Sequence, residues 1–237
     1  MQKGEKLYEG KAKILYLTDN PRQLIQHFKD DATAFDGLKK GTIQGKGVVN
    51  NQISIILFNL LKKRGIESHL VEQLSDNEML VKRVEIVPVE VVVRLISTGS
   101  LCKRYGFQEG QILAQPIVEL YYKNDQLHDP LMNDDHVLAM GLATATELTQ
   151  MKRQALQISA ILREFFDSIG IDLVDFKLEF GRYQDRILLA DEISPDTCRF
   201  WEKGTRRKLD KDRFRQDLGN VEKTYQEMLQ RIGAKAT

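Results

Sequence analysis

The sequence has few of the residues that mark disulfide-rich or zinc-stabilised proteins. Among its 237 residues there are only two cysteines, Cys102 and Cys198, and neither belongs to a Cys-x-x-Cys pair. The four histidines have no zinc-binding spacing with each other or with a cysteine. A structural zinc site is therefore not expected. Because no export signal is visible, we also predict that both thiols are reduced.

Long hydrophobic runs are missing as well. A membrane-spanning helix needs about 20 apolar residues, whereas the longest candidate, residues 53–61, is interrupted by Ser54 and Asn59. The first six residues, MQKGEK, lack the apolar centre of a signal peptide. We therefore expect a cytoplasmic protein that makes no membrane contact.

An excess of charge of either sign is absent. The chain has 35 Lys and Arg residues against 34 Asp and Glu residues, which gives a formal net charge of +1. A nearly neutral chain does not attract nucleic acid or anionic lipid as a whole. No stretch interleaves aromatic with basic residues, as binders of single-stranded nucleic acid do. We expect no nucleic-acid partner, so any anion must be bound by a local cluster.

What remains is the composition of a globular protein, with 42% hydrophobic and 29% charged residues. Strands and helices are expected in mixed order without a regular βαβ rhythm, which predicts an α+β fold. Pro88 lies at the join of two expected strands. We place a domain boundary near there, with a β-rich nucleotide-binding domain at 1–85 and an α+β domain carrying substrate and metal residues at 86–237. The expected elements are a hairpin at 6–17, a helix at 21–29, an irregular loop at 30–47, a helix at 48–63, strands at 79–84 and 87–96, a helix at 148–169, a hairpin of strands 171–180 and 186–193, and a helix at 211–231.

The last expected hairpin carries the most informative pattern. Successive side chains of a strand point to opposite faces, so Asp175, Lys177 and Glu179 form an acid–base–acid row, about 7 Å apart per step. If the two strands pair, Asp191 falls within one residue of facing Glu179. Neighbouring carboxylates repel each other unless a cation lies between them. We interpret this pair as ligands of Mg²⁺ carried on substrate phosphates, which needs few protein oxygens; the alternative is a solvated strand face.

The first expected hairpin has the turn sequence Gly-Lys-Ala-Lys at residues 10–13. Small residues let a ligand approach the backbone, whose N–H groups then bind anions. The spacing places Lys11 and Lys13 on one face. The segment is not a Walker A motif and is closer to the glycine-rich hairpin that covers ATP in kinases. A solvated basic turn is the alternative.

A third cluster joins the strand at 87–96 to the turn after it. Glu90 and Arg94 share one face of an otherwise apolar strand, so each needs a partner or a ligand. The turn at residues 97–100 (Ser-Thr-Gly-Ser) runs into a helix start, which offers donors for a phosphate. A helix cap beside a buried Glu–Arg pair is the alternative. Five further charged residues are candidates for the site, although each is a weak signal when taken alone: Lys123, Asp129, Arg199, Lys211 and Arg215.

Taken in chain order, these pieces resemble the SAICAR synthetase family (phosphoribosylaminoimidazole-succinocarboxamide synthases) in its short bacterial form. The chain departs from the family pattern at Leu95, Ser97 and Thr98, where the family usually has Asn and small alanines. The matching stretches are residues 8–13, 34–37, 45–47, 87–90, 99–101, 128–130, 175–181, 191–196 and 210–215.

The resemblance implies an enzyme that joins the carboxylate of CAIR to the amine of L-aspartate, with ATP converted to ADP and phosphate. An acyl phosphate is the expected intermediate, because a carboxylate reacts poorly with an amine until it carries a leaving group. The family fold has two α+β domains with ATP between them, related to ATP-grasp and kinase-like folds. Bacterial members are commonly homodimers, so a homodimer is expected here.

The resemblance also implies a role for each site residue. The ATP site is formed by Gly10, Lys11, Ala12, Lys13, Val81, Lys82 and Lys123, and the magnesium ligands are Glu179 and Asp191. The CAIR and aspartate sites are formed by Asp36, Glu90, Arg94, Ser100, Asp129, Arg199, Lys211 and Arg215. The groups closest to the chemistry are Lys13, Lys177 and Asp175. Catalysis would be electrostatic, with developing phosphoryl charge stabilised by the lysines and the metal.

Two other functions remain possible at this stage. A kinase would use the same hairpin lysines and metal carboxylates, although the chain has no HRD-type catalytic loop and no DFG motif. A non-catalytic nucleotide sensor would bind ATP without turnover. Dependence of phosphate release on added aspartate distinguishes the ligase from both.

Overall fold

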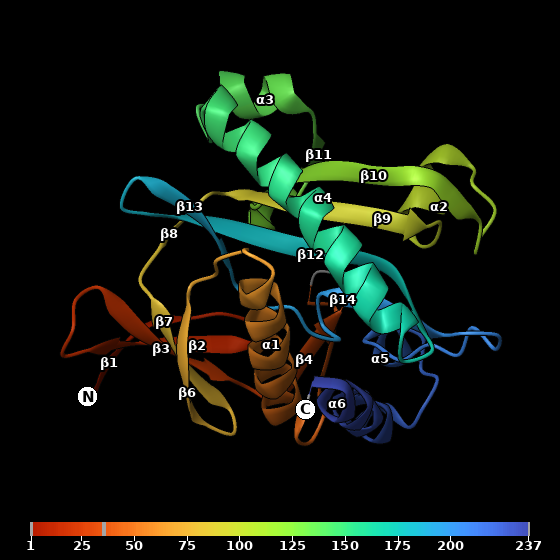
Figure 1. Cartoon of the computed structure of the whole chain (residues 1–237), viewed down its shortest axis with the longest axis horizontal. Helices are drawn as coiled ribbons and strands as arrows, with labels where there is room; N and C mark the ends of the chain where they lie inside the picture. The colour runs from red at the N-terminus through yellow and green to blue at the C-terminus, as the bar shows by residue number, and fades with distance from the viewer. Residues whose placement is uncertain (1, 35–36, 237) are drawn as a thin grey trace.

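The computed structural model describes residues 2–34 and 37–236. The first third of the chain forms a five-stranded antiparallel sheet, in the order β1-β2-β3-β7-β6 (Figure 1). Its strands are β1 (Lys3–Glu9), β2 (Lys13–Thr18), β3 (Gln23–Phe28), β6 (Leu70–Ser75) and β7 (Glu78–Lys82). The hairpin predicted around Gly10 is confirmed by the β1–β2 pair.

The predicted helix at 21–29 is wrong, because this segment is strand β3. Leu24, Ile25 and Phe28 have the spacing of one helical face, which produced the error. In the structure β3 lies between β2 and β7, and all three side chains are buried. Pairing on both sides and burial by the sheet outweigh a weak helical pattern.

The irregular loop predicted at 30–47 is only partly correct. A two-stranded ribbon of β4 (Asp31–Ala34) and β5 (Lys39–Thr42) occupies most of it. Helix α1 (Lys46–Lys63) follows and matches the predicted helix, including its end at Arg64 and Gly65, where φ is 83°.

The second sheet has seven strands, and β12 (Ile171–Tyr183) is its hub. The main order is β11-β10-β9-β12-β13, while β8 and β14 pair with further parts of β12. The hairpin predicted over residues 171–193 is confirmed. The other strands are β8 (Glu85–Ile86), β9 (Val89–Ile96), β10 (Ile112–Tyr122), β11 (Leu131–Met132), β13 (Arg186–Ala190) and β14 (Cys198–Glu202).

Helices flank this second sheet. The longest, α4 (Ala145–Asp167), crosses one face and contacts β9, β10, β12 and β13, as Figure 1 shows. The predicted helix at 148–169 is therefore confirmed, and it ends just before Gly170, where φ is 73°. The shorter helices are α2 (Ser100–Tyr105), the 3₁₀ turn η1 (Asp125–Leu127) and α3 (Asp134–Ala139).

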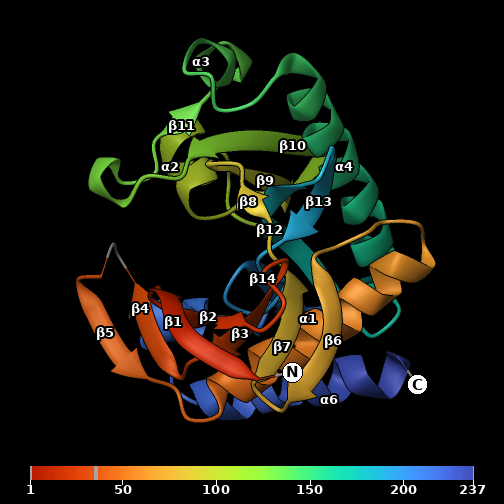
Figure 2. The same ribbon diagram turned by 90° about the vertical axis from the view of Figure 1, so that its left-hand side faces the viewer.

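The single helix predicted at 211–231 is instead two helices, α5 (Asp212–Arg215) and α6 (Val221–Ala236). The chain between them takes positive φ at Asp217, Gly219 and Asn220, which a continuous helix cannot contain. Helix α6 then lies beside α1 in both views (Figure 2). The end of the chain thus packs against its first helix.

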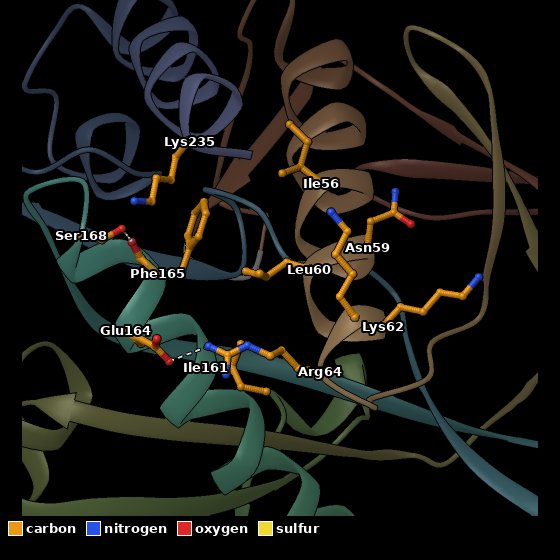
Figure 3. A pocket seen from close by; sticks show the side chains of 11 residues that line it. Ile56, Asn59, Leu60, Lys62, Arg64, Ile161, Glu164, Phe165, Ser168 and Lys235 are labelled. Carbon is orange, nitrogen blue, oxygen red and sulfur yellow. Dashed lines mark hydrogen bonds and ion pairs between the residues drawn. The ribbon is translucent and has the colours of Figure 1, made fainter. Parts of the chain in front are cut away.

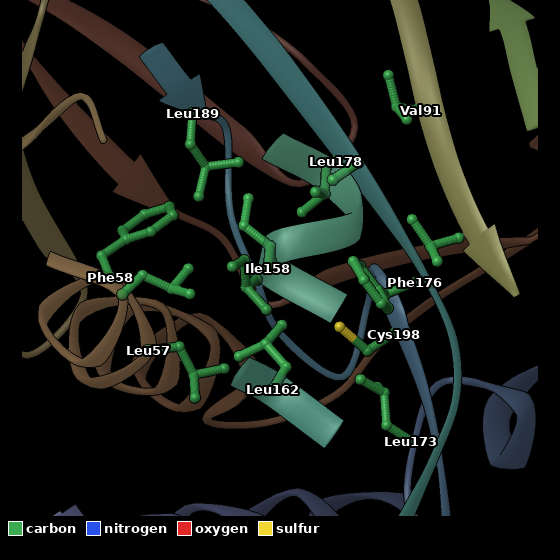
Figure 4. Close-up of a cluster of buried hydrophobic side chains, with 14 of the residues drawn as sticks. Leu57, Phe58, Val91, Ile158, Leu162, Leu173, Phe176, Leu178, Leu189 and Cys198 are labelled. Atoms are coloured by element: carbon green, nitrogen blue, oxygen red, sulfur yellow. The ribbon is translucent and has the colours of Figure 1, made fainter. Parts of the chain in front are cut away.

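One hydrophobic core joins the two sheets and their helices. In Figure 4, Leu57 and Phe58 of α1 lie close to Ile158 and Leu162 of α4 and Leu189 of β13. The sheets themselves separate near residue 85, between β7 and β8, but the domain boundary there stays a prediction. Two antiparallel sheets with flanking helices confirm the α+β class.

Cys102 and Cys198 are both free thiols, as predicted. No helix within residues 2–34 and 37–236 combines the length and the apolar character needed to cross a bilayer.

Candidate active site

The predicted row on β12 lies at the centre of a charged cluster. Asp175, Lys177 and Glu179 alternate with buried Phe176 and Leu178, which fix the strand against the core. Lys177 Nζ lies 2.8 Å from Glu90 and 2.7 Å from Glu179. Strand pairing, in which Lys177 is opposite Val92 on β9, brings these side chains together.

Two further lysines converge on the carboxylates of the β12–β13 hairpin. Lys123, which follows β10, donates to both oxygens of Glu179 at 2.8 Å. Lys13, at the start of β2, donates to Asp191 and lies 2.8 Å from Glu192. Chain segments from both sheets therefore meet at one interleaved set of cations and carboxylates.

The ionisation states follow from these contacts. Burial favours the neutral form of Lys177, but Glu179, Glu90 and Asp191 outweigh it and hold the lysine pKa well above its usual value. Lys13 is raised in pKa in the same way, against burial, by Asp191 and Glu192. Burial and mutual repulsion would raise the pKa of Glu179 and Asp191, yet the lysines keep both below their usual values. Lys13, Lys177, Glu179 and Asp191 are therefore charged at neutral pH.

Glu179 and Asp191 have the arrangement that the sequence predicts. Glu179 is paired with Ala190, so Asp191 is the next residue along the partner strand. Asp191 directly follows the last residue of β13, with φ at 62°, and its carbonyl accepts a hydrogen bond from the Gln26 side chain at 3.2 Å. No cluster of three or more His, Cys, Asp or Glu side chains within residues 2–34 and 37–236 is placed to hold a metal. The pair fits an ion that takes its remaining ligands from phosphates and water.

A second cluster, rich in arginine, lies at the other end of the row. Arg94 on β9 is buried and reaches Glu119 at 2.6 Å, Asp175 at 2.7 Å and the Ser100 hydroxyl at 3.0 Å. Arg199 on β14 also reaches Asp175, at 2.9 Å. Asp175 therefore joins two guanidinium groups, whose planar donor sets suit a phosphate.

The third part of the site surrounds Asp196. Its carboxylate receives Lys46 at 2.9 Å and Tyr225 at 2.7 Å, while Lys211 lies at 3.5 Å. Arg215, one turn beyond Lys211, is 2.6 Å from Asp212. Cations thus surround this end of the site, although each has a nearby carboxylate.

A cavity of about 360 Å³ connects the arginine cluster with Lys177 and Asp196. Its lining contains seven of the predicted residues: Glu90, Arg94, Ser100, Asp175, Lys177, Arg199 and Arg215. A larger cavity of about 800 Å³ lies between α1, α4 and α6, where Leu60, Ile161 and Phe165 line it beside the Arg64–Glu164 ion pair (Figure 3). None of the predicted site residues lines that larger cavity, so we place the active site at the smaller one.

The chain matches the family model described as SAICAR synthetase over residues 6–232. The chain belongs to the SAICAR synthetase family. It is 59% identical to the phosphoribosylaminoimidazole-succinocarboxamide synthase of Chloroherpeton thalassium, over 98% of this chain and 99% of the relative. It is 55% identical to the synthase of Persephonella marina, over 99% of both chains.

Solved structures of the SAICAR synthetase family agree with this membership. The enzyme of Ehrlichia chaffeensis superposes with a TM-score of 0.95 at 47% identity, covering 97% of this chain and 99% of that one. A SAICAR synthetase solved in complex with ADP has a TM-score of 0.93 at 49% identity, covering 95% and 96%. The predicted family and fold are confirmed, and the chain is an ATP-dependent ligase of purine biosynthesis.

Other predicted residues of this SAICAR synthetase family member lie around the two clusters. Lys11 pairs with Asp125 at 2.8 Å, near the loop that carries Lys123. The Asp129 side chain accepts the backbone N–H of Asn124 at 2.8 Å, which holds that loop in shape. Asp36 lies outside the described residues.

The remaining residues predicted for the ATP site belong to the first sheet and its first turn, and most of their contacts are backbone hydrogen bonds. Gly10 donates its N–H to the backbone carbonyl of Lys13 at 2.8 Å, and the Ala12 carbonyl accepts the N–H of Lys29 at 2.8 Å. Val81 is buried in β7, between β3 and β6, and the N–H of Lys82 bonds to the His69 carbonyl at 2.7 Å. Gly10 and Ala12 thus lie in the turn between β1 and β2, Val81 and Lys82 lie in β7, and their contact with a nucleotide stays a prediction.

Several charged groups of the site were not singled out from the sequence: Lys46, Glu119, Glu192, Asp196 and Asp212. Glu119 stands between Val118 and Leu120 on β10, the same signal of a charge in an apolar strand that identified Glu90. Lys46 begins α1, where the helix dipole disfavours a cation unless an anion compensates. Asp196 is that anion, and Lys46 is almost completely buried against it.

Proposed function

We propose that the chain condenses CAIR, 5-amino-1-(5-phosphoribosyl)imidazole-4-carboxylate, with L-aspartate to form SAICAR, while ATP becomes ADP and phosphate. The family membership supports the reaction, and the relative solved with ADP supports a nucleotide product. The observation that carries the proposal is the β12 row, since Asp175, Lys177 and Glu179 connect an arginine cluster to a lysine–carboxylate cluster.

The two clusters suit the two phosphate-bearing substrates. Arg94, Arg199 and Ser100 can hold the phosphate of CAIR, and Asp175 keeps both guanidinium groups in place. Lys13 and Lys123, now paired with Asp191 and Glu179, can donate to the phosphates of ATP. Lys177, between the clusters, is then near the carboxylate and the phosphoryl group that must meet.

Magnesium fits the carboxylate pair as an ion carried in on ATP. Glu179 is buried and Asp191 half-buried, both are ionised and close to each other, and lysines otherwise neutralise them. When bound, Mg²⁺ would supply charge neutralisation for the phosphate oxygens. Lys13 and Lys123 would then exchange their carboxylate partners for phosphate oxygens.

We propose that the reaction proceeds through an acyl phosphate. A carboxylate oxygen of CAIR attacks the γ-phosphorus of ATP and ADP leaves. The neutral amine of aspartate then attacks the acyl carbon, the C–O bond to phosphate breaks, and the new amide loses one proton to solvent. Lys13 and Lys177 stabilise the charge that develops on the transferring phosphoryl oxygens.

The test is ADP release measured with CAIR, ATP and a panel of amino acids, leaving each component out in turn. We expect release only when CAIR and L-aspartate are both present. Phosphorylated product without aspartate would instead establish a kinase, and ATP binding without turnover a nucleotide sensor. The homodimer implied by the resemblance and the cytoplasmic location expected from the sequence stay predictions.

Lys177→Ala and Asp191→Asn should each reduce turnover by at least about 100-fold, because each removes a charge that acts on the transferring phosphoryl group. Cooperative unfolding should be retained in both. The matched controls are Lys152→Ala and Asp134→Asn, which alter an ion pair of 2.8 Å on the surface of α3 and α4. Near-normal rates in the two site variants would mean that the site is wrongly placed.

A further inference from the structure

Asp196 connects the cavity to two side chains that lie behind it. It lines the cavity, and its two oxygens are held from different elements. Oδ2 accepts from Lys46, the first residue of α1, at 2.9 Å, and Oδ1 accepts from the Tyr225 hydroxyl of α6 at 2.7 Å. The C-terminal helix thereby reaches a carboxylate of the active site.

Tyr225 and Lys46 do not line the cavity themselves. Each is 1% exposed, and neither is among the residues that surround the 360 Å³ space. A role of either residue in the reaction must therefore pass through Asp196. Asp196 is ionised at neutral pH. Burial alone would raise its pKa, but the positive charges of Lys211 and Lys46 outweigh this effect and hold the pKa below the usual range.

Lys211 is held much less firmly than Lys46. Within the described chain its ammonium has one side-chain acceptor, Asp196, at 3.5 Å, the long limit for a hydrogen bond. An ammonium group has three N–H donors, so most of this capacity is available to an incoming anion. Burial, reinforced by repulsion from Lys46, lowers the pKa of Lys211, and an anionic ligand would reverse that effect.

We propose that Tyr225 is a positioning residue that turns Asp196 away from Lys211, leaving the lysine ammonium to bind a carboxylate of L-aspartate. This inference rests on the proposed function and on the substrate-site role that the family resemblance implies for Lys211, which lies against the cavity-lining Asp196. Arg94 and Arg199 are engaged with Asp175 at the proposed CAIR phosphate site, and Arg215 is engaged with Asp212, so Lys211 is the cation of this end of the site with unused donors for a carboxylate. Without the tyrosine hydroxyl, Asp196 would shift toward Lys211 and compete with the substrate.

The experiment is steady-state kinetics of Tyr225→Phe, which removes one hydroxyl and keeps the ring in the core. We expect the KM for L-aspartate to rise roughly tenfold, in keeping with the loss of a hydrogen bond to a charged group. The KM for ATP should stay within about twofold, since binding at the lysine–carboxylate cluster does not involve Asp196. Tyr105→Phe on α2, where the ring is 58% exposed, is the matched control and should leave every constant unchanged.

A double-mutant cycle with Lys211→Met distinguishes positioning from packing. If Tyr225 acts through Lys211, adding Tyr225→Phe to the Lys211→Met variant should cause no further rise in the KM for L-aspartate. An unchanged KM in the single variant, with only a lower melting temperature, would reduce Tyr225 to a structural role and overturn the inference. A full additional effect in the Lys211→Met background would overturn it as well. Failure of the proposed function would look different, because the parent enzyme itself would then not turn over CAIR and L-aspartate.

Discussion

Gly47 shows how a single side chain can disturb the connection between the first sheet and α1. A Cβ at this position would lie 2.4 Å from the backbone oxygen of Phe28, which cannot move without displacing β3. The Gly47 N–H also donates to Asp30 at 2.8 Å, which fixes the start of the helix. We predict that Gly47→Ala destabilises the protein by roughly 1–3 kcal/mol, as overpacking does elsewhere. Urea unfolding followed by circular dichroism measures this change.

Gly233→Ala is the matched control for that prediction. Gly233 lies within α6. Apart from its chain neighbours and the nearby backbone of the helix, no atom lies within 4 Å of where an added Cβ would be. Replacement should stabilise the helix by up to about 1 kcal/mol, because alanine has the higher helix propensity. Equal effects of the two substitutions would show that the Phe28 carbonyl does not restrict position 47.

At the residue scale, the sequence revealed charged groups that stand in apolar strands. Glu90, Arg94 and the β12 row were identifiable because burying a charge demands a partner. The identity of each partner could not be predicted, since Lys123 meets Glu179 across 56 residues and Lys13 meets Asp191 across 178. The strand order of the second sheet brings Lys123 to Glu179, and the meeting of the two sheets brings Lys13 to Asp191.

At the scale of one element, α4 illustrates how a helix end depends on pH. Thr144 and Glu147 form a reciprocal capping box, in which each side chain bonds to the backbone N–H of the other residue. Glu147 also accepts from Arg182 at 2.6 Å. The bond from Arg182, with further help from Thr144, lowers the pKa of Glu147 to about 2 despite partial burial.

We predict that Glu147→Gln flattens the stability profile in acid. A carboxyl with a depressed pKa stabilises the fold fully above its unfolded pKa of about 4.5, and this contribution is lost as the pH falls toward about 2. The parent protein should therefore lose melting temperature more steeply than the variant between pH 4.5 and 2.5. Thermal melts in a pH series check this. Glu164→Gln, on the exposed side of the same helix, should follow the parent, and indistinguishable slopes for all three proteins would contradict the prediction.

The elements that were predicted wrongly have two different physical causes. Residues 23–28 have a short apolar pattern that suits either a helix or a strand, and only pairing with β2 and β7 decides between them. The long elements α1 and α4 were predictable because their apolar faces extend over several turns. The break between α5 and α6 falls at Gly219 and Asn220, which have positive φ. Both residue types adopt this conformation readily, but the amphipathic pattern of the whole segment suggested one continuous helix.

At the scale of the whole molecule, the class and family could be predicted because many weak motifs occur in collinear order. The meeting of the two sheets could not. The site lies where Lys13 from the first sheet reaches Asp191 at the end of β13, and where Lys46 from α1 reaches Asp196. Gln26 adds a third contact across the same junction. The active site therefore exists only when both halves are assembled.

The continuity of the core makes a prediction about folding. The two sheets divide near residue 85, but α1 packs against α6, and Leu57 and Phe58 belong to the same core as Ile158 (Figure 4). A fragment of residues 1–85 would expose that face of α1 to water. Exposing apolar surface costs about 25 cal/mol of folding free energy for each Å². We predict that this fragment alone shows no cooperative thermal transition, because its core is completed by the rest of the chain.

The complementary measurement is to mix the 1–85 fragment with a fragment of residues 86–237. Association should restore a cooperative transition and, if the site is assembled correctly, ADP release with CAIR and L-aspartate. Leu57→Ala in the first fragment should prevent this recovery, since it removes packing from the shared core at a cost of about 2–5 kcal/mol. The control is Leu38→Ala at an exposed position between β4 and β5, which should leave the recovery unchanged. Cooperative melting of the isolated 1–85 fragment would instead make the boundary near residue 85 a division between independently folding domains, and the shared core would then hold together two units that are already formed.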